Sequence, residues 1–346
     1  MKLPDNLERV FKMDTLRLTK NNLENAAALI QAGEIVAFPT DTVYGLGANA
    51  TNEDAVRKIF KAKGRPADRP LSVLVNHPDA LEQFGKDIPA GAKKLAEKFW
   101  PGPLTIIVKD ANIFAPSVTA GKRTVGLRMP NNPIALQFIN QAGVPLATPS
   151  ANSTGRPSPT LAEHVLGDLD GKISAVIDGG ETAYGIESTV LDYSDTEHPV
   201  LLRSGNISKE TIESIINREV YLPNKQPKTN QKNSKTHSDK HYEPMIPVYA
   251  VHSPWDQALK IMTEKEEKIG LLANEEIISK FEEDVEATFS LGKANDISSA
   301  NRQFFNGLRT LEKSGATVIL VETFKENELS IPYMNRLQEA ANKKSI

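Results

Sequence analysis

The stretch Pro39-Thr-Asp-Thr-Val-Tyr-Gly-Leu-Gly47 follows an apolar, strand-like run and precedes a helix that ends at Lys63-Gly64-Arg65-Pro66. Thr51 and Asp54 have the spacing of a capping box, and an apolar stripe follows them at helical spacing, so we predict a helix over 52–63. The glycine and proline of the second stretch end this helix. Hydroxyls, glycines and two cations are thus joined in one strand-turn-helix unit. This composition suits recognition of a small polar molecule beside a polyphosphate.

Lys63 and Arg65 leave the predicted helix beside a turn. An ammonium and a guanidinium placed there can converge on phosphate oxygens, the first as a point charge and the second through two parallel hydrogen bonds. The alternative is that Lys63 only neutralises the negative end of the helix dipole. The segment by itself favours neither interpretation.

Composition bounds the class of protein. The chain has 346 residues, of which 39% are hydrophobic and 25% charged, and its net charge is −3. This is long enough for two domains with their own cores. There is no cysteine, which excludes disulfides, thiolate nucleophiles and cysteine-zinc sites. The sequence begins without an apolar signal core and has no apolar run long enough to span a membrane, so we expect a cytoplasmic protein with no membrane segment.

Two units are expected. Residues 223–243 have almost no apolar side chains and read as a linker. We predict a domain over 1–222 with a twisted mixed sheet and helices, and a small α/β domain over 244–346 in which strands and helices alternate around a largely parallel sheet. The fold class is therefore α/β in both parts.

Two further segments carry polar side chains at predicted strand ends. Thr124, Gly126 and Arg128 share one face of a strand, and Arg128 at its end can meet a carboxylate, although a lone arginine is more often solvated. The cluster 148–160 follows a strand and precedes a helix, for which Thr160 and Glu163 predict a capping box. Anionic ligands commonly bind where strand ends meet a helix start, so we interpret 148–160 as a binding loop.

Other chemistries find less support. The six histidines show no metal-ligand spacing, and no Ser-His-Asp triad is apparent. The spacing Gly45-x-Gly47-x-x-Ala50 fits a dinucleotide fingerprint, which keeps an oxidoreductase open. A weak RNA-binding surface is a second alternative, although few aromatics accompany the basic residues. That surface would comprise Lys58, Lys61, Lys63, Arg65, Lys122, Arg123 and Arg156.

Taken together, the ordered segments resemble the threonylcarbamoyl-AMP synthase family, in the two-domain form whose front half is a YrdC-like domain. The resemblance covers nearly the whole chain. It rests on the following segments: 39–50, Lys63-Gly64-Arg65-Pro66, 99–105, 125–130, Pro149-Ser150-Ala151-Asn152, 178–180, 187–190, Leu202-Arg203 and Asn335-Arg336-Leu337. The resemblance implies a YrdC-like twisted mixed sheet followed by a small Rossmann-like domain.

The family's reaction condenses L-threonine, bicarbonate and ATP into threonylcarbamoyl-adenylate and pyrophosphate, the first step of tRNA threonylcarbamoyladenosine modification. The resemblance further implies Mg²⁺ bound with ATP and, downstream, proteins that transfer the threonylcarbamoyl group to tRNA. No metal-binding side chain is assigned. A carbamate formed from threonine is already an anionic nucleophile, so the absence of a catalytic carboxylate pair or histidine is expected.

The implied site residues fall into three groups. Lys63 and Arg65 are the expected catalytic residues. The expected ATP contacts are Lys63, Arg65, Arg69, Thr124, Ser150, Asn152, Ser158, Arg203 and Tyr242. The expected threonine contacts are Thr40, Arg128, Thr148 and Ser188, with Arg128 taking the carboxylate. The chain departs from the family pattern at Leu74, where many members have a histidine that contacts the amino acid.

Overall fold

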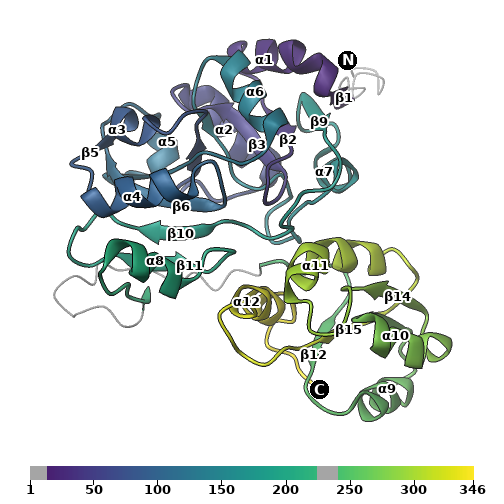
Figure 1. Cartoon of the computed structure of the whole chain (residues 1–346). Coiled ribbons are helices and arrows are strands. Elements are labelled where there is room, and N and C mark those ends of the chain that lie inside the picture. The colour runs from purple at the N-terminus through teal and green to yellow at the C-terminus, as the bar shows by residue number, and fades with distance from the viewer. Residues whose placement is uncertain (1–13, 224–240) are drawn as a thin grey trace, which may run out of the picture.

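The computed structural model describes residues 14–223 and 241–346, which form two α/β units with separate sheets (Figure 1). Most of the predicted linker, residues 224–240, lies outside the described residues. The described strands before it form one sheet and those after it form another. The predicted α/β class is confirmed for both parts.

The first sheet has eleven strands in the order β1-β9-β2-β3-β8-β4-β7-β6-β10-β11, with β5 paired to β6. Its pairing is mixed, because β6 runs antiparallel to β7 while β4 and β7 are parallel. The strands are β1 (Leu16–Thr19), β2 (Val36–Phe38), β3 (Gly45–Asn49), β4 (Ser72–Leu74), β5 (Gly85–Lys86), β6 (Leu104–Asp110), β7 (Thr124–Arg128), β8 (Leu146–Ala147), β9 (Ala175–Asp178), β10 (Thr189–Asp192) and β11 (Val200–Arg203).

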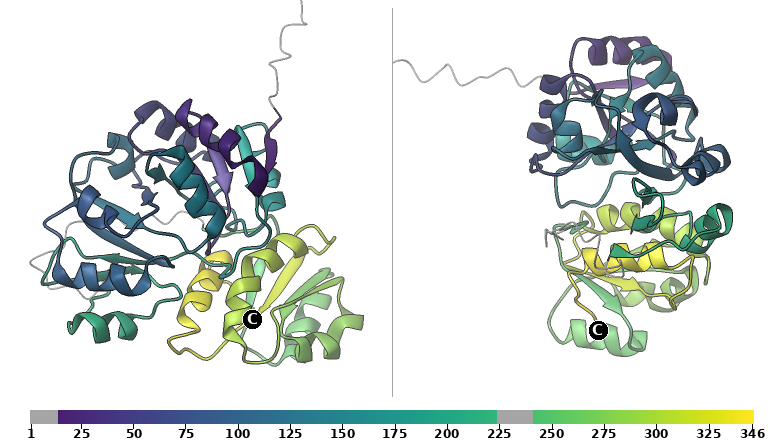
Figure 2. Two further views of the ribbon diagram at one scale, coloured as in Figure 1. Left: turned by 45° about the horizontal axis from the view of Figure 1, so that its top comes forward. Right: turned by 90° about the vertical axis from the view of Figure 1, so that its left-hand side faces the viewer.

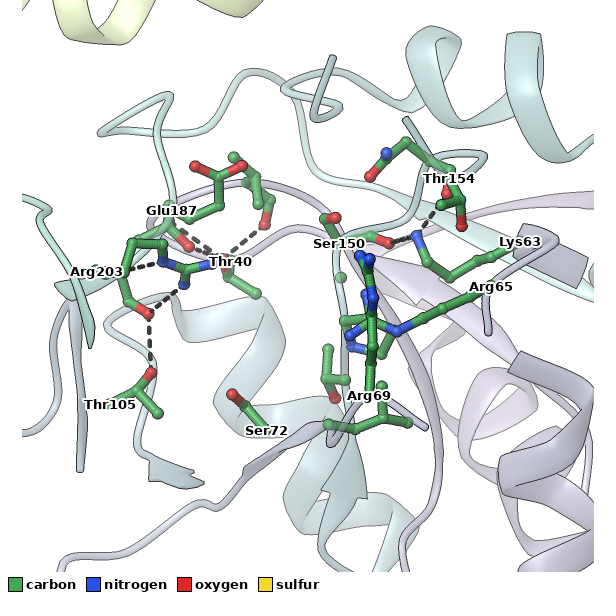
Figure 3. Close-up of a pocket in the computed structure, with 18 of the residues that line it drawn as sticks. Thr40, Lys63, Arg65, Arg69, Ser72, Thr105, Ser150, Thr154, Glu187 and Arg203 are labelled. Atoms are coloured by element: carbon green, nitrogen blue, oxygen red, sulfur yellow. Dashed lines mark hydrogen bonds between the residues drawn. The ribbon is translucent and has the colours of Figure 1, made fainter. Parts of the chain in front are cut away.

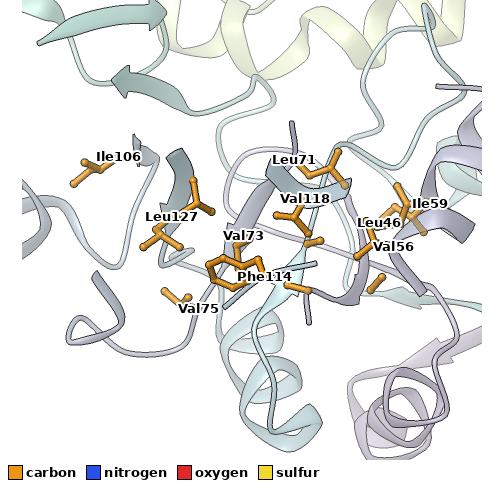
Figure 4. Packing of buried hydrophobic residues seen from close by; sticks show 14 of the residues in the cluster. Leu46, Val56, Ile59, Leu71, Val73, Val75, Ile106, Phe114, Val118 and Leu127 are labelled. Carbon is orange, nitrogen blue, oxygen red and sulfur yellow. The ribbon is translucent and has the colours of Figure 1, made fainter. Parts of the chain in front are cut away.

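Helices cover both faces of this sheet. They are α1 (Leu23–Gln31), α2 (Glu53–Lys63), α3 (Ala80–Phe84), α4 (Ala90–Phe99), α5 (Pro116–Thr119), α6 (Pro133–Ala142), α7 (Ala162–Leu169) and α8 (Lys209–Ile216). Val36 and Phe38 pack with α1 and α6, whereas Ala37 between them joins the core formed with α2, α4 and α7. This alternation is the two-residue period of a strand buried on both faces. Figure 4 shows part of the core formed with α2, α4 and α7, where Val56 and Ile59 of α2 face Leu46 of β3.

The stretch 39–47 is not a simple turn. Residues 45–49 form β3, which pairs antiparallel with β2, so the predicted strand-turn-helix unit is a hairpin followed by α2. Glycine is required by close packing. A Cβ on Gly45 would lie 2.3 Å from Thr148 Cγ2, and one on Gly47 would lie 2.8 Å from Phe38 Cε1. The glycines therefore serve the sheet, and the dinucleotide fingerprint drawn from them is wrong because they open no helix.

Both predicted capping boxes are also wrong. Helix α2 begins one residue later than predicted, and Asn52 caps it by accepting a hydrogen bond from the Ala55 amide at 3.1 Å. Helix α7 begins at Ala162 with no side-chain cap. The Thr160 amide instead donates to His164 Nδ1 at 3.2 Å. The predicted ending of α2 is confirmed, because Gly64 adopts the left-handed conformation with φ of 61°.

The second sheet has four parallel strands in the order β12-β15-β13-β14. Its strands are β12 (Val248–Val251), β13 (Ile269–Ala273), β14 (Ala287–Ser290) and β15 (Val318–Glu322), and its helices are α9 (Trp255–Thr263), α10 (Glu275–Phe281), α11 (Ile297–Leu311) and α12 (Ile331–Ala340). Helices α11 and α12 lie on the side of this domain that meets the first domain (Figures 1 and 2). Val43 and Ile186 of the first domain belong to the same apolar cluster as these helices, so the two domains share buried contacts.

Candidate active site

A cavity of about 300 Å³ lies in the first domain, where strand ends of the mixed sheet meet the loops that follow them. Eleven of the thirteen side chains predicted for the site line it. These are Thr40, Lys63, Arg65, Arg69, Arg128, Thr148, Ser150, Asn152, Ser188, Arg203 and Tyr242. Residues that are distant in sequence are thus gathered around one space.

Figure 3 shows a cation-rich end of the cavity, formed by Lys63, Arg65 and Arg69 beside Ser150 and Thr154. Lys63 is the last residue of α2, and the sharp left-handed turn at Gly64 carries the chain on to Arg65. Burial lowers the pKa of Arg65 to about 10, with Arg69 and Arg203 adding to the effect. Three basic side chains facing one space repel one another, which favours an anionic occupant.

Lys63 is held by the loop that follows β8. Its Nζ donates to the Ser150 and Asn152 carbonyls, each at 2.5 Å, and its own carbonyl accepts a hydrogen bond from the Thr154 amide at 2.9 Å. Burial, together with the neighbouring Arg65, lowers the pKa of Lys63 to about 7. Lys63 therefore shapes the 150–154 loop as well as lining the cavity. The dipole-neutralising interpretation of this residue is insufficient.

Three buried polar atoms at this end have no hydrogen-bond partner among the described residues. They are Arg65 Nε, Asn152 Oδ1 and Thr154 Oγ1. An unpaired polar atom costs free energy when it is buried, and such atoms are few in folded proteins. Their concentration around one cavity is the arrangement expected of groups that bind a polar ligand.

The opposite end carries hydroxyls. Ser188 Oγ lies 2.8 Å from Thr105 Oγ1, and Arg203 donates to the Ser188 carbonyl at 2.9 Å and to Ser188 Oγ at 3.1 Å. Figure 3 places Thr40 on the same side as Arg203 and Thr105. Thr40 Oγ1 donates to the Val43 carbonyl at 2.7 Å. These bonds fix the orientation of each hydroxyl before any ligand arrives.

Arg128, at the end of β7, is buried and already paired. Its Nη2 is bonded to the buried Asp41 carboxylate, its Nη1 donates to Thr42 Oγ1 at 2.9 Å, and its Nε donates to the Gly102 carbonyl at 3.0 Å. The solvated-arginine alternative is therefore wrong. An arginine has five N–H groups, so one hydrogen remains on each terminal nitrogen for a carboxylate in the cavity.

Glu187 is the carboxylate of the cavity wall, and it is fully engaged. Its Oε1 accepts from Ser158 Oγ at 2.5 Å and its Oε2 from Arg336 Nε at 3.1 Å. Burial alone would raise the pKa of Glu187, but Arg336 and Arg203 hold that pKa below its ordinary value. A carboxylate kept ionised between cations is unsuited to proton transfer near neutral pH.

Two predicted ATP contacts do not line the cavity. Thr124 stands at the opposite end of β7 from Arg128, paired with Lys109 of β6, and Ser158 is buried behind the wall against Glu187. Sequence reasoning in turn missed several lining residues. These are Thr42, Ser72, Thr105, Thr154, Arg156, Glu187 and His241. Thr42 lies inside the quoted stretch and Thr154 and Arg156 inside the predicted loop, so position in those motifs was a usable signal.

Leu74 and the end of the linker complete the wall. Leu74, at the position where the resemblance implies a histidine contact, is buried and lines the cavity, so that position offers an apolar contact. His241 and Tyr242 also line the cavity, His241 near Arg69 and Arg65, and Tyr242 near Glu187 and Arg203. Burial, with Arg69 and Arg65 nearby, lowers the pKa of His241. Tyr242 packs on Phe305 of α11 with ring centroids 5.0 Å apart.

The described residues give little support to the other chemistries. No group of three histidine, aspartate or glutamate side chains in 14–223 and 241–346 is arranged to hold a metal ion. Within the same ranges no helix has the length and apolar character needed to cross a membrane. Of the seven basic residues considered for RNA binding, Lys63, Arg65 and Arg156 line the cavity instead.

Comparison with known proteins matches both halves of the chain. A family model described as telomere recombination matches residues 28–205, and a model described as the threonylcarbamoyl-AMP synthase C-terminal domain matches residues 207–342. The threonylcarbamoyl-AMP synthase of Bacillus subtilis (strain 168) is 40% identical over 338 residues, which cover 96% of each chain. The crystal structure of Pyrococcus abyssi Sua5 complexed with L-threonine has a TM-score of 0.85 at 38% identity and covers 96% of this chain and 98% of its own.

Proposed function

This chain belongs to the threonylcarbamoyl-AMP synthase family, whose activity is the first step of threonylcarbamoyladenosine formation in tRNA, and from that premise we propose how its cavity performs the reaction. The substrates are L-threonine, bicarbonate and ATP. The observation that carries the proposal is the single cavity with clustered cations at one end and ordered hydroxyls at the other. Nucleotide and amino acid bind side by side in it.

The triphosphate binds at the cationic end. Arg65 and Arg69 line the cavity there, and Arg65 Nε is buried with no partner among the described residues. A planar guanidinium suits paired contacts to phosphate oxygens. Asn152 Oδ1 and Thr154 Oγ1 are likewise available to the nucleotide, with Ser150 beside them. Arg203, which is bonded to Ser188 at the hydroxyl end, and Tyr242 are further nucleotide contacts where the nucleotide meets the amino acid. Thr124 and Ser158 act at most indirectly.

Lys63 has two tasks at this end. It holds the Ser150 and Asn152 carbonyls in place, and its charge lies beside the phosphates. A lysine ammonium has three N–H donors, so it can donate hydrogen bonds to backbone carbonyls and to an anion at the same time. With two donors directed at the loop, the third remains for a phosphate oxygen.

Threonine binds at the hydroxyl end. Arg128 takes the carboxylate with the two N–H groups left after its bonds to Asp41, Thr42 and Gly102. Thr40, Thr148 and Ser188 surround the side-chain hydroxyl and the amine. Since these hydroxyls are themselves hydrogen-bonded, the site is preorganised and loses little entropy when the amino acid arrives.

The reaction needs positioning more than proton transfer. Bicarbonate gives carbon dioxide and hydroxide, the threonine amine bonds the carbon of carbon dioxide, and the proton that the nitrogen loses joins the hydroxide as water. An oxygen of the resulting carbamate then attacks the α-phosphorus. The bond from the α-phosphorus to the bridging oxygen breaks, and its electron pair leaves with pyrophosphate. Charge on the transferred phosphoryl group grows during this step, so nearby cations lower the barrier. Closure of the wall keeps water from the labile carbamate.

Mg²⁺ enters with ATP as part of the substrate. The described residues hold no group of three histidine, aspartate or glutamate side chains placed to bind a metal ion, and Glu187 is already bonded to Ser158 and Arg336. Phosphate oxygens and water would hold the ion, which matches its preference for keeping several waters. The adenylate product passes to proteins that transfer the threonylcarbamoyl group to tRNA.

An omission assay tests this function. Pyrophosphate release from ATP is followed in the complete mixture and with threonine or bicarbonate left out in turn. Release that requires both supports the proposal. Release that continues without threonine would show a plain ATP pyrophosphatase and overturn it.

A further inference from the structure

We propose that the second domain is a positioning element for the cavity, acting through the three consecutive residues Arg156, Pro157 and Ser158, which we name the strip. Each strip residue is tied to the second domain, directly or through one buried carboxylate. This inference rests on the proposed function, because it assigns nucleotide and threonine to the two ends of the cavity. It gives α11 and α12 a task in the chemistry of the first domain.

Arg156 is bonded to Glu312, which follows α11. Its Nη1 and Nη2 donate to the two Glu312 oxygens at 2.9 and 2.5 Å, and both side chains are largely buried. Glu312 also accepts from the Met245 amide at 3.0 Å. Met245 comes just after Tyr242, so one carboxylate joins the loop of the cavity wall to the segment that closes it.

Arg309 of α11 reaches the nucleotide end. It donates to the Pro157 carbonyl at 2.5 and 3.1 Å and to Asp168 at 2.8 and 3.2 Å. Asp168 Oδ2 accepts in turn from the Ser153 amide at 3.1 Å. Ser153 stands between Asn152 and Thr154, two lining residues that each have a buried oxygen atom with no hydrogen-bond partner among the described residues. Two hydrogen bonds, both to Asp168, therefore connect Arg309 to the loop at the nucleotide end of the cavity.

Arg336 of α12 reaches the threonine end. Its Nε donates to Glu187 Oε2 at 3.1 Å and its Nη1 to the Ser204 carbonyl at 2.6 Å. Ser188 follows Glu187 in the chain, and Arg203 precedes Ser204. Both Ser188 and Arg203 line the cavity, and Arg203 donates hydrogen bonds to Ser188. Ser158 of the strip donates to the same Glu187.

The two arginines differ from ordinary surface ion pairs. Both are about 2% exposed, and each binds a main-chain carbonyl together with a buried carboxylate. Removing one partner of such a pair leaves an uncompensated charge, which the loop relieves by moving toward water. The displaced loops are those that carry the cavity wall, so the effect of the change falls on substrate binding.

Hydrogen exchange of the full-length enzyme without substrates tests the proposal, together with KM and kcat. Arg309→Gln is expected to speed exchange in 153–158 and to raise the KM for ATP about tenfold while the KM for threonine changes less. Arg336→Gln is expected to speed exchange in 187–189 and to raise the KM for threonine more than that for ATP. Arg309→Lys and Arg336→Lys keep the positive charge but lose the planar guanidinium. Their KM values are expected to lie between those of the parent enzyme and those of the glutamine variants.

Arg302→Gln is the matched control, an exposed arginine of the same helix α11, and it should change neither exchange nor KM. If the Arg309 and Arg336 variants lower the melting temperature while local exchange and both KM values stay as in the parent, the contacts only stabilise the interface and the proposal is wrong. Exchange is measured without turnover. It therefore still decides the proposal if the omission assay rejects the proposed function.

Discussion

The Arg128 guanidinium is bonded to the Asp41 carboxylate, and both side chains are buried beside the cavity. The second oxygen of Asp41 has no hydrogen-bond partner among the described residues. Asp41 therefore balances the charge of Arg128 through one carboxylate oxygen only. The same contact orients the guanidinium, whose remaining N–H groups can bind a second anion. The residue proposed to take the threonine carboxylate is thus held ready by a carboxylate of the protein.

Asp41→Asn should lower stability and make the enzyme more responsive to threonine. The change leaves the charge of Arg128 uncompensated, which costs about 3 kcal/mol in a buried pair. The carboxylate of bound threonine then supplies the missing anion. We expect saturating threonine to raise the melting temperature of Asp41→Asn more than that of the parent enzyme. Threoninamide, which lacks the carboxylate, should not do so. Equal shifts with threonine in the two proteins would exclude the carboxylate contact to Arg128.

Arg65→Ala should separate catalysis from stability. Among the described residues, the Arg65 side chain makes one hydrogen bond, at 3.3 Å to the Pro70 carbonyl, so we expect little of the fold to depend on it. Loss of a cation facing the transferred phosphate is expected to reduce kcat by about two to three orders of magnitude, while the melting temperature changes little. The exposed Lys61→Ala on α2 is the control and should retain full activity. Near-parental turnover in Arg65→Ala would remove the phosphate role.

Lys63→Ala should behave differently from Arg65→Ala. Because Lys63 Nζ holds the Ser150 and Asn152 carbonyls, its removal loosens the 150–154 loop as well as abolishing adenylate formation. Only the lysine variant loses the hydrogen bonds that hold the 150–154 loop, so we expect the loop to stay ordered in Arg65→Ala and to loosen in Lys63→Ala.

The hydroxyl end of the cavity predicts strong selection against valine. Valine has the shape of threonine without its hydroxyl, and its binding would leave Thr40, Thr148 and Ser188 facing a methyl group. Buried polar groups left unpaired reject such an analogue, so we expect kcat/KM for valine to be lower by at least about a hundredfold. Serine should fall between the two. The measurement is amino-acid-dependent pyrophosphate release, and similar values for valine and threonine would place the amino acid elsewhere.

Local patterns predicted the elements that local chemistry determines. Helix α2, its apolar face and the cation pair after it follow from side-chain spacing and from Gly64, and all appear in the structure. Strand β3 was missed because a polar, glycine-rich stretch resembles a turn, and only packing against Phe38 and Thr148 explains those glycines. In that case tertiary packing overrode local propensity.

The long-range pairs were beyond sequence reasoning. Asp41 and Arg128 are 87 residues apart, and Glu187 and Arg336 are 149 apart. Nothing in the neighbourhood of an arginine indicates which distant carboxylate it will meet. Ser158 illustrates the consequence, because its place in a polar loop suggested a ligand contact whereas its hydroxyl is bonded to Glu187. Eleven of the thirteen predicted side chains line the cavity, but the distant partners that hold them could not be predicted.

Lys63 predicts that ATP binding takes up protons. Burial lowers its pKa to about 7, so near pH 8 most of the free enzyme carries a neutral amine at this position. A phosphate beside it favours the charged form and raises that pKa, and a proton must therefore be taken from solvent as ATP binds. The sign follows directly, since affinity for ATP falls as the pH rises above about 7. Calorimetry near pH 8, in buffers of different ionisation enthalpy, counts the protons.

The matched comparison is Lys63→Met, which cannot titrate and should bind ATP, more weakly, without proton uptake. The last phosphate pKa of ATP is about 6, so its phosphates are already deprotonated near pH 8 and do not contribute to the measured proton uptake. His241 also faces the cationic end, and burial lowers its pKa too, so His241→Gln is measured alongside. Proton uptake that survives in Lys63→Met but disappears in His241→Gln would show that His241, and not Lys63, takes up the proton. Uptake lost only in Lys63→Met identifies the ammonium as the group that charges when the triphosphate arrives.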